Sequence, residues 1–413
     1  MSLLAEWKTF NPQQRNAFVA SFLGWTLDAF DFFLMVFVLR AVAADFHTDV
    51  KAVSLALTLT LAVRPLGALV FGMLADRFGR RPVLMADILL FSILELASAF
   101  APSLFTLLVL RAAFGFAMGG EWGIGASLTM ETIPAKARGA ASGILQVGYP
   151  CGYLLASVVY GLLFDTIGWR GMFAVGVLPA LLVLFIRRNV EESPVWHRMR
   201  ARPRRSLASL LRGHGLLFLY VVVLMTPFNF FSHGTQDLYP TFLQAQRNLP
   251  THAVSTIVII ANIGAIIGGI VFGTLSQRIG RRRAIIIAAL LALPIIPLWA
   301  FSTSLVLLGL GAFLIQISVQ GVWGVIPVHL NELSPDEVRG TFPGFAYQLG
   351  NLLASANATL QAGFAANHGG NYALALAIVA AGAAVAIALL TFVGPEAHSV
   401  EFGEASEGKP PLV

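Results

Sequence analysis

The stretch that decides the fold runs Val70-Phe-Gly-Met-Leu-Ala-Asp-Arg-Phe-Gly-Arg-Arg81. It returns 201 residues later as Val271-Phe-Gly-Thr-Leu-Ser-Gln-Arg-Ile-Gly-Arg-Arg282. The same offset relates a second set of residues: Gly120, Trp122, Gly123, Glu131, Pro134, Arg138, Gly139 and Gly143 recur as Gly321, Trp323, Gly324, Glu332, Pro335, Arg339, Gly340 and Gly344. A constant offset between separate motifs indicates two copies of one unit in the same orientation.

The composition places both copies in a membrane. The chain has 413 residues, of which 57% are hydrophobic and only 12% charged, and its mean hydropathy is +0.77. Soluble domains carry about 25% charged residues, so roughly half of the usual charge is missing. Repeated apolar runs of about 18–25 residues, each long enough to cross a bilayer, account for the deficit.

Twelve such spans can be placed, six in each copy. We therefore predict an all-α membrane protein of twelve transmembrane helices, with six-helix halves at 1–187 and 215–394, a cytoplasmic linker at 188–214 and a disordered cytoplasmic tail at 395–413. The spans lie near 17–41, 52–75, 82–101, 104–129, 140–163, 169–187, 215–243, 252–275, 284–302, 305–330, 341–364 and 371–394.

The basic residues alternate between the two sides of the predicted spans. They gather in the loops after even-numbered spans, whereas the opposite loops hold little beyond Lys51 and Arg247. An excess of Lys and Arg marks the cytoplasmic side, so both termini should be cytoplasmic. The net charge of +6 then reflects topology and contact with the lipid bilayer, and we expect no nucleic-acid partner. The plasma membrane, in a bacterium the inner membrane, is the expected location.

These features resemble the major facilitator superfamily. Gly72-Met-Leu-Ala-Asp-Arg-Phe-Gly-Arg-Arg81 is similar to that superfamily's loop signature between spans two and three, although the repeat carries Gln277 where Asp76 stands. The resemblance covers nearly the whole chain. It implies a secondary transporter that works by alternating access, with a substrate site near the membrane midplane between the halves. We expect the protein to be a monomer.

The charged residues around this signature form a predicted cytoplasmic gate. Acidic and basic groups at the cytoplasmic ends of spans can form ion pairs that stabilise one orientation and break during transport. A purely structural role is the alternative. The residues concerned are Asp76, Arg77, Arg80, Glu131, Arg138, Arg278, Glu332 and Arg339.

A polar stripe interrupts the apolar run near 216–242. On a helix, Asn229, His233, Asp237 and Thr241 recur every four residues and share one face, with Ser232 and Gln236 beside them. Polar groups in hydrocarbon are costly, so a whole stripe predicts a protein-lined or watery cavity.

Few ionisable residues lie deep inside the other spans. Arg64 lies ~18 Å into span two at 1.5 Å per residue, close to the bilayer middle. A buried guanidinium must be paired, and it matches a carboxylate in bidentate geometry. Arg64 is therefore predicted to bind an anionic substrate, or alternatively to pair with Asp28, Asp31 or Glu121. If substrate captures the cation, a membrane carboxyl left behind would take up a proton readily, which gives a route to proton–anion symport.

The proton carrier is left open among these groups. Asp28, Asp31, Glu121 and Asp237 are carboxyl candidates, and His233 is a further one because histidine titrates near neutrality. The repeat offset places Asn229 opposite Asp28, and Ser232 opposite Asp31, in the two halves. The two polar helices are thus predicted to face one central cavity.

The stripe also carries a narrower resemblance. Asn229-x-x-Ser232-His233-x-Thr235-Gln236-Asp237-x-x-x-Thr241 is similar to the span-seven signature of Jen-type lactate/pyruvate permeases, in the sialate:proton symporter family. The resemblance implies proton-coupled uptake of short monocarboxylates. It places Asn229, His233 and Gln236 near substrate, makes Asp237 important to transport and gives an arginine at the position of Arg64 a part in carboxylate binding.

The sequence therefore predicts a proton-coupled symporter of a small monocarboxylate such as lactate or pyruvate. A symporter of a larger organic acid (a sialate, an aromatic acid or a dicarboxylate) is the first alternative, and a non-transporting sensor is a remote one. We expect no enzymatic activity, because no ATPase phosphate loop and no zinc-spaced His/Glu pair is present. Neither a cofactor nor a metal is expected, and the single cysteine, Cys151, excludes an intrachain disulfide.

Overall fold

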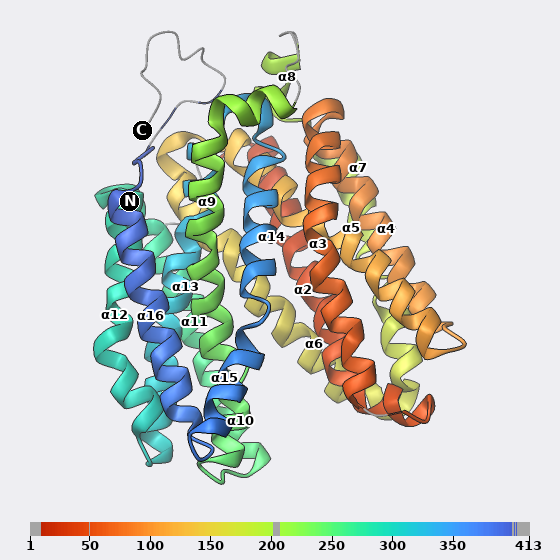
Figure 1. Cartoon of the computed structure of the whole chain (residues 1–413). Helices are drawn as coiled ribbons and strands as arrows, with labels where there is room; N and C mark the ends of the chain where they lie inside the picture. Colours follow the sequence, from red (N-terminus) through yellow and green to blue (C-terminus); the bar gives the residue numbers. More distant parts are fainter. Residues whose placement is uncertain (1–9, 49, 201–206, 399, 401, 403–413) are drawn as a thin grey trace.

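The computed structural model describes residues 10–48, 50–200, 207–398, 400 and 402. Every regular element in these residues is a helix (Figure 1). The first half contains α2 (Pro12–Asp45), α3 (Val50–Phe78), α4 (Arg80–Ala99), α5 (Leu104–Thr132), η1 (Ala135–Ala137), α6 (Arg138–Val175) and α7 (Ala180–Asn189). The short helix α8 (Pro194–Arg200) follows.

The second half repeats this order with two helices broken. It contains α9 (Leu207–Gln236), α10 (Tyr239–Ala245), α11 (Thr251–Ile279), α12 (Arg281–Phe301), α13 (Leu305–Leu333), η2 (Asp336–Val338), α14 (Phe342–Ala354), α15 (Asn357–Asn367) and α16 (Tyr372–Val393). The all-helical fold predicted from the repeat is confirmed.

Ten described segments are long and apolar enough to cross a membrane. The difference from the twelve predicted spans comes from two places where helices bend or break. One segment, Ala135–Asn189, contains Gly168 in a left-handed conformation (φ 62°), and the chain turns back there to make two passes. The other is the α14–α15 pair, which is separated by a turn at Ser355 and Ala356, so neither helix is long enough by itself.

The predicted polar helix through 243 is wrong at its end. The structure ends α9 at Gln236 and starts α10 at Tyr239. Pro240 explains the break, because it has no amide hydrogen to donate to the carbonyl of Gln236. Asp237 therefore lies in the turn after α9, and Thr241 belongs to a separate short helix.

The helices of each half pack closely at glycines in equivalent places. A Cβ on Gly67 of α3 would lie 1.7 Å from the carbonyl oxygen of Phe116 in α5, and one on Gly268 of α11 would lie 2.3 Å from that of Ile317 in α13. Only glycine permits such crossings. Because the two sites are 201 residues apart, the sequence repeat is also a repeat of packing.

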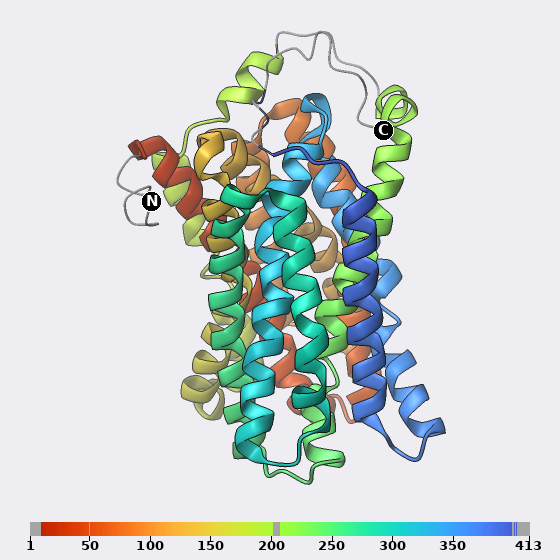
Figure 2. The same cartoon turned by 90° about the vertical axis from the view of Figure 1, so that its left-hand side faces the viewer.

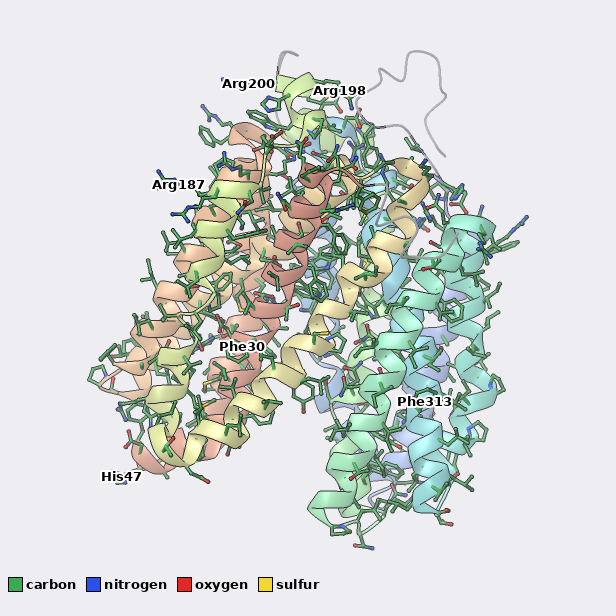
Figure 3. All side chains as sticks on the ribbon, turned by 180° about the vertical axis from the view of Figure 1, so that it is seen from behind. Phe30, His47, Arg187, Arg198, Arg200 and Phe313 are labelled. Carbon is green, nitrogen blue, oxygen red and sulfur yellow. The ribbon has the colours of Figure 1, made fainter. Side chains whose placement is uncertain are left out.

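The two halves meet at one end of the molecule and diverge toward the other (Figures 1 and 3). Arg187, Arg198 and Arg200 lie at the end where they meet, and His47 lies at the opposite end (Figure 3). Helix α2 begins, and α16 ends, at this same arginine-rich end (Figure 2). By the charge rule we expect this closed end to face the cytoplasm, and we call it the cytoplasmic end. On that assignment the structure is outward-facing.

The close α3–α5 crossing gives a stability prediction. We expect Gly119→Val to destabilise the protein by ~3 kcal/mol or more, because a Cβ there would lie 2.1 Å from the carbonyl oxygen of Arg64, which is backbone. Gly382→Val in α16 is the matched control, because nothing lies within 4 Å of its Cβ position. Thermal unfolding of the purified proteins distinguishes the two, and equal melting temperatures would contradict the proposed packing role.

Candidate functional site

A cavity of about 510 Å³ lies between the two halves. It is lined by residues from Trp25 to Val36 of α2 and from Leu57 to Arg64 of α3. From Trp25 and Arg64, this lining extends toward the end where the halves diverge. The second half contributes Asn229, Ser232, His233, Thr235, Gln236 and Asp237. The cavity thus brings together Arg64 and every residue of the predicted polar stripe from Asn229 to Asp237.

Arg64 is the charged group on the first-half side of this cavity. Its Nη2 donates to Oδ2 of Asp28 at 2.8 Å, and both side chains are almost fully buried. Asp28 itself does not line the cavity. The arginine therefore stands between the cavity and its own buried counter-ion, where another carboxylate can compete for it.

A network of polar side chains forms the second-half wall. Nδ1 of His233 lies 3.2 Å from the Asp237 carboxylate, and its Nε2 lies 3.1 Å from Oδ1 of Asn351 in α14. Gln236 donates to Oε1 of Gln316 in α13 at 3.1 Å. Asp237 is thus hydrogen-bonded to His233, and the pair is neutral overall when the imidazole is protonated.

Aromatic rings cover much of the remaining wall. Tyr149 of α6 stacks on Trp25 at 5.5 Å between ring centroids and makes an edge contact with Phe33 at 5.5 Å. On the other side, Tyr347 packs 5.4 Å from Trp323. The arrangement is one fixed cation surrounded by planar apolar surfaces and a few amide groups, which suits an organic anion.

The other predicted proton carriers of the first half lie behind the cavity wall. Asp31 and Glu121 are fully buried and do not line the cavity. Asp31 sits close to Gly176, beside Glu95, which is paired with Arg111 at 2.5 Å. Glu121 packs against Gly24 of α2. The structure therefore places these two acids outside the cavity itself.

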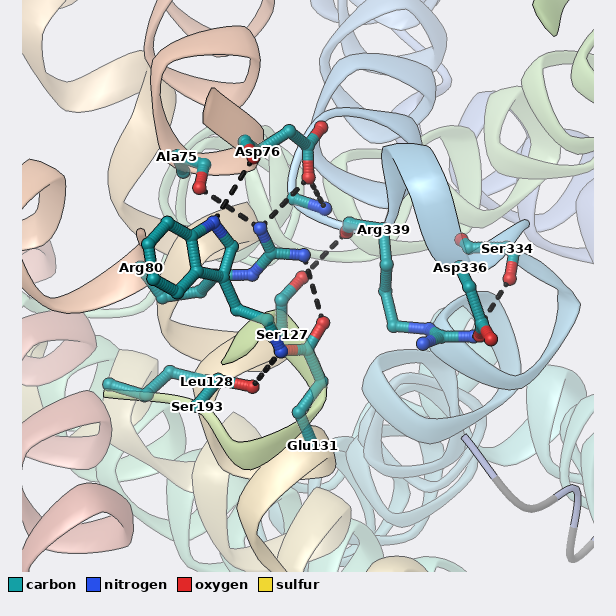
Figure 4. A network of polar contacts seen from close by, with 12 residues as sticks. Ala75, Asp76, Arg80, Ser127, Leu128, Glu131, Ser193, Ser334, Asp336 and Arg339 are labelled. Carbon is teal, nitrogen blue, oxygen red and sulfur yellow. Dashed lines mark hydrogen bonds and ion pairs between the residues drawn. The ribbon is translucent and has the colours of Figure 1, made fainter. Parts of the chain in front are cut away.

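The cytoplasmic end of the first half holds an ion-pair chain (Figure 4). Arg80 contacts Asp76 at 3.1 Å and Glu131 at 2.9 Å. Asp76 also crosses to the second half, where it accepts hydrogen bonds from the backbone N–H groups of Gly340 at 2.8 Å and Thr341 at 3.1 Å, and from the Thr341 hydroxyl at 2.6 Å. Asp76 thus joins the two halves directly.

The second half repeats this arrangement with one substitution. Arg281 makes a two-bond pair with Glu332, at 2.9 and 3.0 Å. Gln277 stands where Asp76 stands in the first half, and its Oε1 accepts from the N–H of Gly139 at 3.0 Å. The departure from the family signature therefore keeps the acceptor and omits the charge.

Three other predicted gate arginines have different contacts. Arg138 donates to the carbonyls of Met130 at 2.9 Å and Val400 at 2.6 Å, and Arg339 pairs with Asp336 and donates to the carbonyl of Asn331 at 3.1 Å. Arg77 lies over the ring of Phe78 at 5.3 Å.

The region expected to be a disordered tail makes contacts where it is described. Glu396 accepts from the N–H groups of Arg281 and Arg282, at 3.3 and 3.1 Å. The ring of Phe402 is buried between the guanidinium groups of Arg138 and Arg339, at 3.6 and 3.8 Å from its centroid. We call residues 396–402, where described, the C-terminal strap. It contacts both halves at the cytoplasmic end.

Outside the membrane, Glu192 occupies the place in the first half that Glu396 occupies in the second. It accepts from the N–H groups of Arg80 at 2.9 Å and Arg81 at 3.1 Å, at the start of α4. Burial raises the pKa of Glu192, while the N–H donors, including that of Ser193, work in the opposite direction. Both halves therefore use a glutamate from a distant segment to cap the helix that follows the signature loop.

Several residues of the site were missed from the sequence. Asn351, Gln316 and Tyr347 lie in spans that show no polar stripe. Asn351 and Gln316 contact α9, and Tyr347 contacts Trp323 of α13, through tertiary packing alone. Arg281 could have been found, because the repeat offset equates it with Arg80.

Comparison with known proteins agrees with this geometry. The sequence profile of the Major Facilitator Superfamily matches residues 18–356 and 238–413. The proton:xylose symporter XylE superposes with a TM-score of 0.78 at 18% identity, over 95% of this chain and 98% of that one. The human organic anion transporter MFSD10 gives 0.70 at 17% identity, over 92% and 99%. At such identities these structures establish the fold alone.

Relatives at higher identity carry names of organic-acid transporters. A carboxylic acid transporter protein homolog of Saccharomyces cerevisiae is 30% identical over 86% of this chain, which spans 63% of the yeast protein. A probable 4-methylmuconolactone transporter of Cupriavidus pinatubonensis is 34% identical, over 86% of this chain and 84% of that protein. The sialic acid transporter NanX of E. coli is 31% identical, over 84% and 86%. The chain is a multi-pass membrane transporter and not an enzyme, and it belongs to the Major Facilitator Superfamily.

Proposed function

We propose that this protein is a proton-coupled symporter of organic acids, and that its substrates are small monocarboxylates of the lactate and pyruvate type. The observation that carries the proposal is Arg64, a cavity-lining cation whose counter-ion, Asp28, lies behind it. Relatives named for carboxylic acids, muconolactone and sialic acid support an organic anion as cargo. The expected location is the plasma membrane, in a bacterium the inner membrane, with both termini cytoplasmic.

Substrate binding starts from competition for Arg64. An incoming carboxylate takes hydrogen bonds of the guanidinium, because this planar group matches a carboxylate with two parallel bonds. The hydroxyl or keto group of the substrate then lies toward Asn229, Ser232, His233 and Gln236, which offer both donors and acceptors.

Proton coupling follows from the same competition. When the substrate engages Arg64, Asp28 loses its partner in a buried site, and an unpaired carboxylate there costs several kcal/mol. Taking up a proton removes that cost, so substrate and proton bind together. The His233–Asp237 pair is the second place where a proton can be held, and we assign Asp31 and Glu121 supporting roles in the same process.

The first alternative is a larger, planar acid. The rings of Trp25, Tyr149 and Tyr347 favour it, because aromatic faces bind unsaturated carboxylates by stacking. The cavity of about 510 Å³ also has room beyond a three-carbon acid.

A panel of acids separates these substrates. We expect proteoliposomes to exchange labelled lactate against internal lactate or pyruvate, with little competition from sialate, muconate or benzoate. In the absence of a pH gradient, adding lactate outside should acidify the interior. Stronger exchange of muconate or benzoate would select the alternative, and uptake driven by a sodium gradient alone would refute proton coupling.

The anchor role of Arg64 predicts a loss of affinity. Arg64→Lys keeps a positive charge without the two-bond geometry, and we expect the KM for lactate exchange to rise roughly 10- to 100-fold, as for one lost charge-assisted contact. The double variant Arg64→Ala/Asp28→Asn leaves no unpaired charge and should fold but not transport. Asn262→Ala is the control, because Asn262 lines the cavity but donates to the Val258 carbonyl of its own helix. A normal KM for Arg64→Lys would refute the assignment.

The cytoplasmic contacts are proposed to act as the gate. Opening toward the cytoplasm has to part Asp76 from Gly340 and Thr341, and Gln277 from Gly139, because these bonds join the two halves. Arg80, Glu131, Arg281 and Glu332 hold the ends of the helices that carry them.

Loss of the Asp76 bonds should shift the protein away from the outward-facing state. In a Cys151→Ser background, we expect Ser232→Cys in the cavity to react with a membrane-impermeant thiol reagent added outside, and Asp76→Ala to slow this reaction severalfold. Glu337→Ala removes an exposed carboxyl near the same end and is the control. Unchanged labelling in Asp76→Ala would contradict the gate.

A further inference from the structure

The first half surrounds one cation with three carboxyl groups. Arg64 on α3 pairs with Asp28 on α2, and Asp87 on α4 and Glu121 on α5 belong to the same region; all four side chains are nearly or fully buried. Asp87 interacts electrostatically with Asp28 and Arg64. Glu121 interacts electrostatically with Asp28, Arg64 and Asp87. Four helices therefore bring their ionisable groups to one cluster.

Glycine packing fixes how close these groups are. Gly119 of α5 lies against the backbone of Arg64, and its neighbour Gly120 lies against Asp87, whose Oδ1 would be 3.3 Å from a Cβ there. The next residue, Glu121, packs against Gly24, one helical turn before Asp28. Three consecutive positions of α5 thus connect Arg64, Asp87 and the helix of Asp28.

Among the described residues, only one of the three carboxyl groups is paired with a cation. Asp28 accepts the hydrogen bond from Arg64, whereas neither oxygen of Asp87 or of Glu121 has a hydrogen-bond partner among the described residues. One guanidinium cannot balance three carboxylates, and an isolated buried carboxylic acid loses its proton only at a cost of several kcal/mol. In this state Asp87 and Glu121 therefore carry protons.

Asp87, Glu121 and Arg64 lie at increasing distances from the cytoplasmic end. The Arg80–Glu131 and Arg80–Asp76 pairs mark one level at the cytoplasmic end. Measured along each helix from that level at 1.5 Å per residue, Asp87 lies ~10 Å away, Glu121 ~15 Å and Arg64 ~18 Å. Asp87 is therefore the carboxyl of this cluster nearest to the cytoplasm.

We propose that Asp87 is the cytoplasmic-side member of a proton relay that runs from Asp28 through Glu121. The proposal rests on the proton-coupled function inferred above and adds the route by which the proton leaves. When substrate departs and Asp28 returns to Arg64, the proton on Asp28 passes to Glu121, the proton of Glu121 passes to Asp87, and that of Asp87 goes to cytoplasmic water. The three carboxyl groups thus go from holding three protons to holding two, and one proton is released into the cytoplasm.

The relay requires small movements. No direct hydrogen bond joins these carboxyls in the outward-facing structure, so each transfer needs a side-chain rotation or a bridging water molecule. Asp87 lines no part of the cavity, so it does not contact substrate. A variant of Asp87 should consequently separate proton movement from substrate binding.

Asp87→Asn tests the relay, because the amide keeps the shape of the side chain but cannot carry the proton. In proteoliposomes we expect its counterflow exchange of labelled L-lactate at equal pH on both sides to stay within about threefold of the wild-type rate. Accumulation driven by an inward proton gradient should fall at least about tenfold, a typical loss when a positioned proton carrier is removed. Asp87→Glu, which restores a titratable group, should recover much of the accumulation.

The controls distinguish the possible failures. Ser92→Ala alters a buried residue of the same helix whose hydroxyl donates only to the Ile88 carbonyl, and both activities should persist in it. Full proton-driven accumulation by Asp87→Asn would overturn the relay, as would loss of exchange together with accumulation in a folded variant. If Asp87→Asn does not fold, Asp87→Glu decides alone: unchanged pH dependence of its accumulation rate would overturn the relay. A wild-type protein without proton-driven accumulation would instead refute the proposed coupling itself.

Discussion

The outward-facing structure depends on two crossed contacts at its cytoplasmic end. Asp76 of the first half accepts from the backbone of Gly340 and Thr341, and Gln277 of the second half accepts from the backbone of Gly139. Each acceptor sits at the end of one half and holds the start of a helix in the other. Other contacts between the halves include hydrogen bonds from the Ser127 hydroxyl to the Arg339 carbonyl and from the Ser142 hydroxyl to the Gly324 carbonyl, both at 2.7 Å. The cavity exists because this end is closed while the other diverges.

The two contacts are equivalent by sequence but differ in charge. A carboxylate bonded to N–H groups is held more strongly than an amide oxygen in the same place, because charge-assisted hydrogen bonds are about twice as strong as neutral ones. The first-half contact is thus the stronger of the two. This difference in strength arises where the second copy departs from the signature, at Gln277 in place of Asp76. One substitution therefore makes one of the two contacts between the halves weaker than the other.

Much of the fold could be read from the repeat, because a fixed offset constrains both copies at once. The offset gave the two halves, and composition gave the membrane. The helix break after Gln236 was not predicted, since hydropathy runs through it without a change. The turn at Gly168, by contrast, falls in the gap between the predicted spans at 140–163 and 169–187. The pairing of Arg64 with Asp28 was one of several open possibilities, because sequence spacing orders residues along a helix but does not say which helices touch. Asn351 and Gln316 could not be found for the same reason: they lie 118 and 80 residues from their partners His233 and Gln236 and meet them only in the folded protein.

The C-terminal strap ties the end of the chain to this closed interface. Phe402 is held by Arg138 and Arg339, which are equivalent residues of the two halves, and its carbonyl oxygen accepts from Arg198 of α8. When the halves part on the cytoplasmic side, the ring can stay with one arginine only. The environment of this ring must therefore alternate once per cycle. A fluorophore carried at this position would report each turnover optically, without altering any membrane-spanning helix.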